Sequence, residues 1–159
     1  MAKQFRQPYK RRPYRHIERR YIVEYVVNRF KNRVYTVFNM RLGPPREELR
    51  KRYPQLPQSW FKVWMPMADA VVVTNDAVYI IEAKIRYPRQ AIGQLLDYKL
   101  RAYNTPELKR FLDRPVIPVL VTPLYDPEIE ETCRLHGIVY DVYTPPWVIE
   151  YMREVKLIP

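Results

Sequence analysis

Two carboxylates and an amine stand within two strongly apolar runs of this sequence. The runs are rich in Val, Ile and Tyr and flank Asn75-Asp76, a turn signal, so together they predict a β-hairpin. With the turn at that position, Asp69 lies directly opposite Glu82, and the alternation of side chains places Lys84 on the same face. Two like charges so close in an apolar setting require neutralisation, which a divalent metal ion supplies.

The other positions of both runs are apolar on both faces. This pattern is typical of central strands that are covered on both sides. A charge cluster in such a position is costly, because an unpaired charge loses its hydration. We therefore interpret Asp69, Glu82 and Lys84 as a candidate functional group, and the family resemblance described next implies that its role is catalytic.

The order Asp69, then Glu82-Ala83-Lys84, resembles the active-site signature of the PD-(D/E)XK nuclease superfamily, whose fold is restriction-endonuclease-like. Further along the chain, Gln94 and Tyr98 resemble the Gln-x-x-x-Tyr motif of the RecB-type branch. Ala68 stands where the signature has proline, a common variation in the superfamily. The resemblance covers about residues 20 to 125.

The resemblance implies Mg²⁺ as cofactor, with Mn²⁺ as a substitute. Its ligands would be Asp69, Glu82 and the backbone carbonyl of Ala83, because Mg²⁺ prefers hard oxygen ligands. Lys84 would either position or deprotonate the attacking water, and sequence does not choose between these roles. Glu24 is the candidate for the acidic residue that many members place on their first helix near the metal.

Nucleic acid is the partner that the resemblance implies. Gln94 and Tyr98 are four residues apart and would share a helix face, where they would contact the substrate together with Arg101. Some RecB-type relatives carry an iron–sulfur cluster on four cysteines. Cys133 is the only cysteine here, so no such cluster is expected.

Basic residues are concentrated at the amino terminus. Residues 1 to 33 hold eleven Lys or Arg against two Glu, a net charge of +9. The whole chain has a net charge of +11, so most of the excess positive charge lies in this segment. Residues 1–15 predict a basic, flexible arm ahead of a single domain over residues 16–159. We expect phosphate contacts from its basic side chains and those that follow: Lys10, Arg11, Arg12, Arg15, Arg19 and Arg20. A solvated tail is the alternative.

Composition adds weaker expectations. The chain has 47% hydrophobic and 28% charged residues, and no apolar run approaches the length of a membrane span. An intracellular, cytoplasmic protein that is not bound to a membrane is expected. The abundance of Ile, Val, Tyr, Arg, Glu and Pro resembles thermophile usage.

Periodicity predicts an α/β protein, an α/β/α sandwich around a central mixed sheet. Trp60 to Met65 is interpreted as the beginning of the hairpin's first strand. The expected helices are 16–31, 46–52, 87–103, 126–135 and 147–155, and the expected strands are 33–40, 68–74, 77–85, 116–122 and 138–143. A strand is the alternative for 16–31, because the segment is rich in β-branched residues.

The leading functional hypothesis is a metal-dependent DNA nuclease acting on ends, single strands or flaps, with RNA not excluded. A Holliday-junction-type resolving endonuclease, which would act as a homodimer, is the enzymatic alternative. A nucleic-acid-binding protein on a retired nuclease fold is a second class. An interaction domain that uses Trp60, Trp64 and Trp147 is a third, with no motif behind it.

Overall fold

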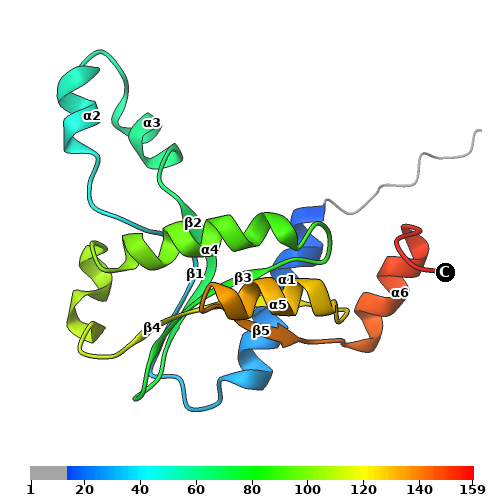
Figure 1. The fold of residues 1–159 in the computed structure, drawn as a ribbon. Helices are drawn as coiled ribbons and strands as arrows, with labels where there is room; N and C mark the ends of the chain where they lie inside the picture. The colour runs from blue at the N-terminus through cyan, green and yellow to red at the C-terminus, as the bar shows by residue number, and fades with distance from the viewer. Residues whose placement is uncertain (1–13) are drawn as a thin grey trace, which may run out of the picture.

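Five strands form one mixed sheet in the computed structural model, which describes residues 14–159 (Figure 1). The first three strands are antiparallel and β3, β4 and β5 are parallel. This arrangement confirms the predicted α/β class and the mixed sheet. In order across the sheet, the strands are β1 (Tyr35–Arg41), β2 (Met67–Val73), β3 (Val78–Ala83), β4 (Val116–Thr122) and β5 (Val139–Val142).

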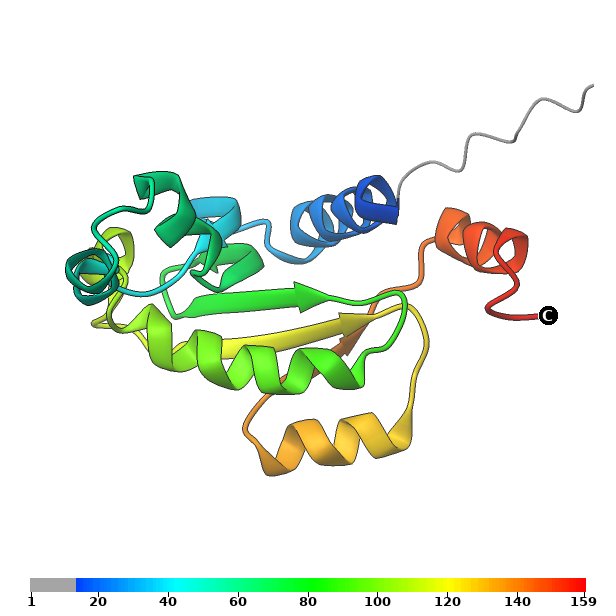
Figure 2. The same cartoon turned by 90° about the horizontal axis from the view of Figure 1, so that it is seen from above.

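Helices cover both faces of the sheet, because alternate strand residues are apolar on each side. One core cluster joins Val71, Ile80 and Leu120 to α4 (Arg89–Ala102) and α5 (Pro127–Leu135). The opposite cluster joins Val72 and Ile81 to α1 (Tyr14–Arg29) and α6 (Pro146–Glu154). Figure 2 shows the resulting three layers, with α4 and α5 on one side of the sheet and α1 and α6 on the other.

The first helix begins at Tyr14, two residues before the predicted domain boundary. Among the predicted phosphate contacts, Lys10, Arg11 and Arg12 lie outside the described residues, and the side chain of Arg15 is not described either.

Between β1 and β2 the chain forms two short helices, α2 (Glu47–Arg52) and α3 (Gln58–Val63). The prediction that Trp60 to Met65 begins the hairpin's first strand is therefore wrong. Only Phe61 of α3 is buried, so its single inward side chain left no helical stripe to recognise. A 3-10 helix, η1 (Pro106–Phe111), links α4 to β4. None of the helices in the described part of the chain is both long and apolar enough to cross a membrane.

Candidate active site

The hairpin of β2 and β3 has the register that the sequence predicts. Its ladder extends from the turn to the pair of Ala70 with Ile81. One step further, the same register places Asp69 opposite Glu82. Ile80 belongs to the core cluster beneath α4, so alternation places Glu82 on that face as well. We call Asp69 and Glu82 the acidic pair.

Side chains replace the backbone ladder at the acidic pair. The backbone N–H of Ala83 donates to Asp69 Oδ2 at 2.9 Å, and the N–H of Asp69 donates a long hydrogen bond to Glu82 Oε2 at 3.4 Å. Lys84 Nζ lies 2.8 Å from Glu82 Oε1. Each carboxylate is therefore held by the neighbouring strand, and one ammonium group contacts Glu82.

The neighbouring strand β1 is distorted beside the pair. Its register places Asn39 opposite Asp69, yet the ladder pairs the residues before and after Asn39 and not Asn39 itself. Asn39 has a φ of 53°, a left-handed conformation in which Asn is one of the better tolerated residues. The distortion interrupts pairing on that side of Asp69, whose N–H bonds to Glu82 instead.

Burial dominates the electrostatics of the site. Glu82 is 2% exposed, and burial, followed by the charge of Asp69, raises its pKa to about 7. Burial also raises the pKa of Asp69, against the opposing effects of the Ala83 N–H and Lys84. For Lys84, burial favours the neutral form, but the Glu82 and Asp69 carboxylates outweigh it and raise its pKa. The pair lacks sufficient positive charge to compensate its desolvation.

Helix α4 brings the predicted motif to the acidic pair. Tyr98 is buried, and its pKa is raised by burial and then by the charges of Glu82 and Asp69, so it lies within electrostatic reach of both. The exposed Gln94 donates from Nε2 to the Tyr98 hydroxyl at 3.3 Å, as expected for residues four apart on one helix. Arg101 lies further along α4, on the protein surface.

Arg101 has partners of its own. It forms an ion pair with Asp97 at 3.1 Å. Its side chain also lies against Gly43, where an added Cβ would be 3.5 Å from the Arg101 Cδ. Any contact between Arg101 and a substrate would compete with the Asp97 pair.

Glu18, an acidic residue of α1 that sequence reasoning missed, acts weakly on the site through its charge. Its charge raises the pKa of Lys84. A signal was present: Glu18 shares a helix face with Tyr21, Ile22 and Tyr25, which are all buried. An acidic residue on the core-facing stripe of a helix is a better candidate than one beside that stripe.

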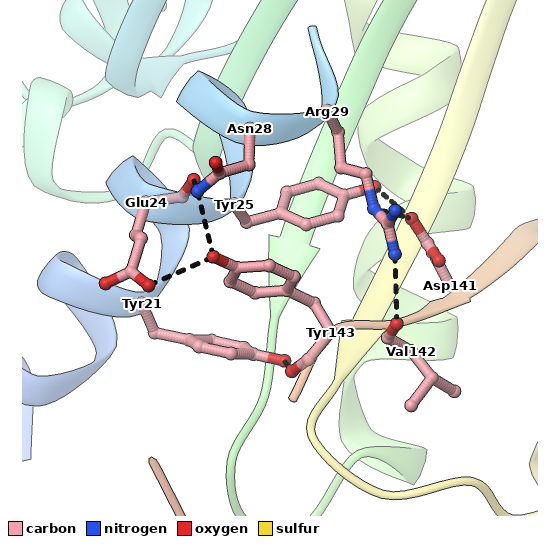
Figure 3. A network of polar contacts seen from close by, with 8 residues as sticks. All are labelled: Tyr21, Glu24, Tyr25, Asn28, Arg29, Asp141, Val142 and Tyr143. Carbon is pink, nitrogen blue, oxygen red and sulfur yellow. Dashed lines mark hydrogen bonds and ion pairs between the residues drawn. The ribbon is translucent and has the colours of Figure 1, made fainter. Parts of the chain in front are cut away.

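Glu24, the predicted first-helix ligand, is engaged elsewhere. Its carboxylate accepts from Trp147 Nε1 at 2.7 Å and from the Tyr143 hydroxyl at 3.0 Å, and Arg20 lies 3.9 Å away. Figure 3 shows Glu24 facing Tyr143 at the junction of α1 with the chain after β5. The structure therefore does not bring Glu24 to the acidic pair.

The same junction fixes the position of α1. The Tyr21 hydroxyl donates to the Tyr143 carbonyl at 2.6 Å, and the Tyr25 hydroxyl donates to Asp141 Oδ2 at 2.9 Å (Figure 3). Burial raises the pKa of both tyrosines, which keeps them protonated as donors. Because Glu18 lies on the same helix, these bonds also determine where Glu18 sits.

The remaining predicted phosphate contacts differ in their surroundings. Arg19 is exposed on α1. The guanidinium of Arg20 lies 4.0 Å from the centre of the Trp147 ring, so this side chain already has a cation–π partner. Arg19 is the freer of the two to meet a phosphate.

The donor set at the acidic pair suits a small dication. Within residues 14–159, no group of three or more His, Cys, Asp or Glu side chains could hold a metal ion. Mg²⁺, however, often binds through one or two carboxylates and keeps several waters. Since the N–H of Ala83 points at Asp69, its carbonyl points towards the same strand and could add a third oxygen.

Comparison with known proteins gives no match: no family model, no curated protein and no solved structure resembles this chain closely enough to be identified.

Proposed function

We propose that this chain is a Mg²⁺-dependent DNA nuclease of the PD-(D/E)XK superfamily, with a restriction-endonuclease-like fold, that hydrolyses phosphodiester bonds at ends, single strands or flaps. The observation that carries the proposal is the acidic pair, with Glu82 buried and in contact with Lys84, and with Tyr98 within electrostatic reach of both carboxylates. The motif residues Asp69, Glu82, Lys84, Gln94 and Tyr98 come from two strands and a helix, yet they gather at one end of β2 and β3.

The free-energy cost of burying two carboxylates favours a catalytic role over simple binding of nucleic acid. A protein that only binds nucleic acid gains nothing from two carboxylates, which repel phosphate. Burying them raises the pKa of both and destabilises the folded protein while they are ionised. A bound dication would neutralise the two carboxylates and remove this cost, and the carboxylates would then act as its ligands.

Each residue has a role that follows from its position. Asp69, Glu82 and the Ala83 carbonyl would hold Mg²⁺, which when bound polarises the scissile phosphate and lowers the pKa of the attacking water. The Lys84 ammonium would neutralise charge on the phosphate and orient the water. The Tyr98 hydroxyl, held by Gln94, would fix one side of the phosphate beside the acidic pair.

Cleavage assays with isosteric variants test the proposal. Asp69→Asn and Glu82→Gln keep the shape of the site and remove one negative charge each, so each should lower Mg²⁺-dependent cleavage by more than about 100-fold, the upper range for merely indirect ligand changes. Labelled single-stranded, duplex, flap and branched DNA would be incubated with Mg²⁺, Mn²⁺ or EDTA.

The surface variant Asp113→Asn is the matched control and should cleave like the unchanged protein, because Asp113 is exposed and pairs with Arg114 on the surface. Normal cleavage by either site variant would refute the assignment. Cutting confined to branched DNA would favour a junction-resolving enzyme over one acting on ends or flaps.

A further inference from the structure

The chain between β1 and β2 forms a projection with little packing of its own. We call residues 42–66 the helical arm. It contains α2 and α3, and Figure 1 shows both helices standing clear of the sheet. None of the residues of α2 is buried, and Phe61 is the single buried residue of α3. The core of the fold therefore gains little from α2 and α3.

The outer face of α3 is apolar and exposed. Trp60 and Trp64 are each 53% exposed, and Val63 is 70% exposed. Trp60 and Trp64 are one helical turn apart, so their Cβ atoms are about 5–6 Å apart on one face, whereas the neighbouring Phe61 is buried. Two neighbouring exposed indoles offer a large apolar area that nothing in the described chain covers.

Basic residues are common in the helical arm. Residues 42–66 contain five Lys or Arg and two Glu. Lys62 lies between the two tryptophans in sequence and is exposed, as is Arg52. Arg46 donates to the Trp64 carbonyl at 3.0 Å, and Arg41 donates to the Lys62 carbonyl, so basic side chains also fix the last turn of α3.

The arm is tied to the body beside the acidic pair. The N–H of Leu42 donates to the Pro66 carbonyl at 2.8 Å, which joins the two chains at the arm's base. The N–H of Gly43 donates to Thr105 Oγ1 at 2.8 Å, and Gly43 has a φ of +106°, which favours glycine. Trp64 precedes Asp69 by five residues, so their Cα atoms are within about 18 Å of each other.

We propose that the helical arm binds an unpaired strand of DNA, with bases stacking on Trp60 and Trp64 and with Lys62 and Arg52 contacting phosphates. The inference rests on the proposed nuclease function and names the element that would hold the strand next to the acidic pair. Exposed aromatic rings with interleaved basic residues are the features by which proteins bind single strands without sequence preference.

Other occupants fit less well. Duplex DNA keeps its bases stacked on each other and offers no free ring faces to the indoles. A second copy of this chain would bring together two basic arms of proteins that each carry a net charge of +11, and like charges oppose such contact.

Binding of oligothymidine to the full chain in EDTA tests the proposal without cleavage. Trp60→Ala and Trp64→Ala should each weaken binding by about 5- to 100-fold, the range for loss of one stacked base. Trp60→Phe and Trp64→Phe keep a ring and should lose much less. Val63→Ala is the matched control, because it removes exposed apolar area from the same face but no ring. Affinity for blunt duplex should change less than twofold in all variants.

Fluorescence gives an independent readout. In a Trp147→Phe variant, Trp60 and Trp64 are the remaining tryptophans, and oligothymidine should quench their emission whereas blunt duplex should not. Unchanged single-strand affinity in Trp60→Ala and Trp64→Ala would overturn the proposal. So would a dimer that the two substitutions convert to a monomer, because the indoles would then be a contact between copies.

The two proposals fail separately. If the arm variants lose single-strand binding but no DNA is cleaved with Mg²⁺ or Mn²⁺, the nuclease function is wrong and the arm's role stands. If cleavage depends on Asp69 but the arm variants bind normally, only the role of the arm is wrong.

Discussion

The Glu82 carboxylate is buried beside a second carboxylate, and its contact with Lys84 does not restore an ordinary pKa. The metal-free protein is therefore destabilised by its own candidate site. Reduced folding stability of the unliganded protein is expected where buried carboxylates form a binding site for a cation. It also gives the site a signature in unfolding experiments that does not depend on knowing the substrate.

We predict that the free energy of unfolding in EDTA falls as pH rises from about 4.5 to 7. Burial and Asp69 raise the pKa of Glu82 from its ordinary 4.5 to about 7, so in this window the folded protein binds more protons than the unfolded chain. The contribution of Glu82 to the free energy of unfolding is fully present below its unfolded pKa. It is lost as pH rises through its folded pKa, by an amount on the order of 3 kcal/mol.

Urea unfolding at a series of pH values checks this dependence. Glu82→Gln should remove most of it, and Glu24→Gln, which removes a carboxyl elsewhere on the fold, should leave it. Excess Mg²⁺ should flatten the curve for the unchanged protein, since the ion stabilises the ionised pair. An identical pH dependence in Glu82→Gln would contradict the argument.

A second prediction at this scale concerns Asn39. Its left-handed backbone is poorly tolerated by β-branched residues, so Asn39→Val should destabilise the protein by about 1–3 kcal/mol and reduce cleavage by shifting Asp69. Asn39→Gly removes the same side chain but accepts the conformation, so it should preserve both stability and cleavage. Thermal unfolding and cleavage assays of the two variants measure the difference. Equal effects would mean that the amide of Asn39, and not its backbone, matters.

Among the elements, α1 carries two acidic residues with different environments. Glu18 acts on Lys84 through its charge, whereas Glu24 is bound by Trp147 and Tyr143. We predict that Glu18→Gln lowers Mg²⁺-dependent cleavage by about 10-fold or more, as for other groups that act next to a metal site. Glu24→Gln should keep cleavage and lose about 1 kcal/mol of stability, the scale of one hydrogen bond.

Cleavage rates and urea unfolding of both variants decide between the two glutamates. If Glu24→Gln abolishes cleavage while remaining folded, the resemblance-based assignment of Glu24 would be right. If neither variant affects cleavage, α1 supports the structure around the site and its acidic charges have no role in cleavage.

Elements with a strong local pattern could be predicted from the sequence, and those whose partners are distant could not. The hairpin register followed from alternation and the Asn75-Asp76 turn, and β4 was predicted at its observed bounds, Val116–Thr122. The segment after Pro57 was predicted as a strand because it is rich in aromatic residues. Most of these residues do not face a core, so no apolar stripe of helical period marks the helix. The contacts of Glu24 could not be predicted, because the chain after β5, which binds it, is more than a hundred residues away in sequence.

For the whole molecule, the sheet divides the structure into a face covered by α4 and α5 and a face covered by α1 and α6 (Figure 2). The acidic pair lies at one end of β2 and β3, where α4, the first half of α1 and the base of the helical arm all approach. A strand of DNA at the pair would therefore meet basic residues from several elements. Its affinity should depend on salt accordingly.

The amino-terminal basic residues are the last contribution to that affinity. Residues 1–13 contain five Lys or Arg and no acidic residue. If several of them bind phosphates, deleting residues 1–13 should weaken DNA binding and reduce the slope of log affinity against log salt by about 0.7 to 0.9 for each phosphate that is no longer bound. Cleavage at saturating protein should change much less, because Asp69, Glu82 and Lys84 lie in the hairpin. Binding of the full and shortened chains, measured between about 50 and 200 mM salt, gives the two slopes. Equal slopes would mean that the grip on DNA comes from the body and the helical arm alone.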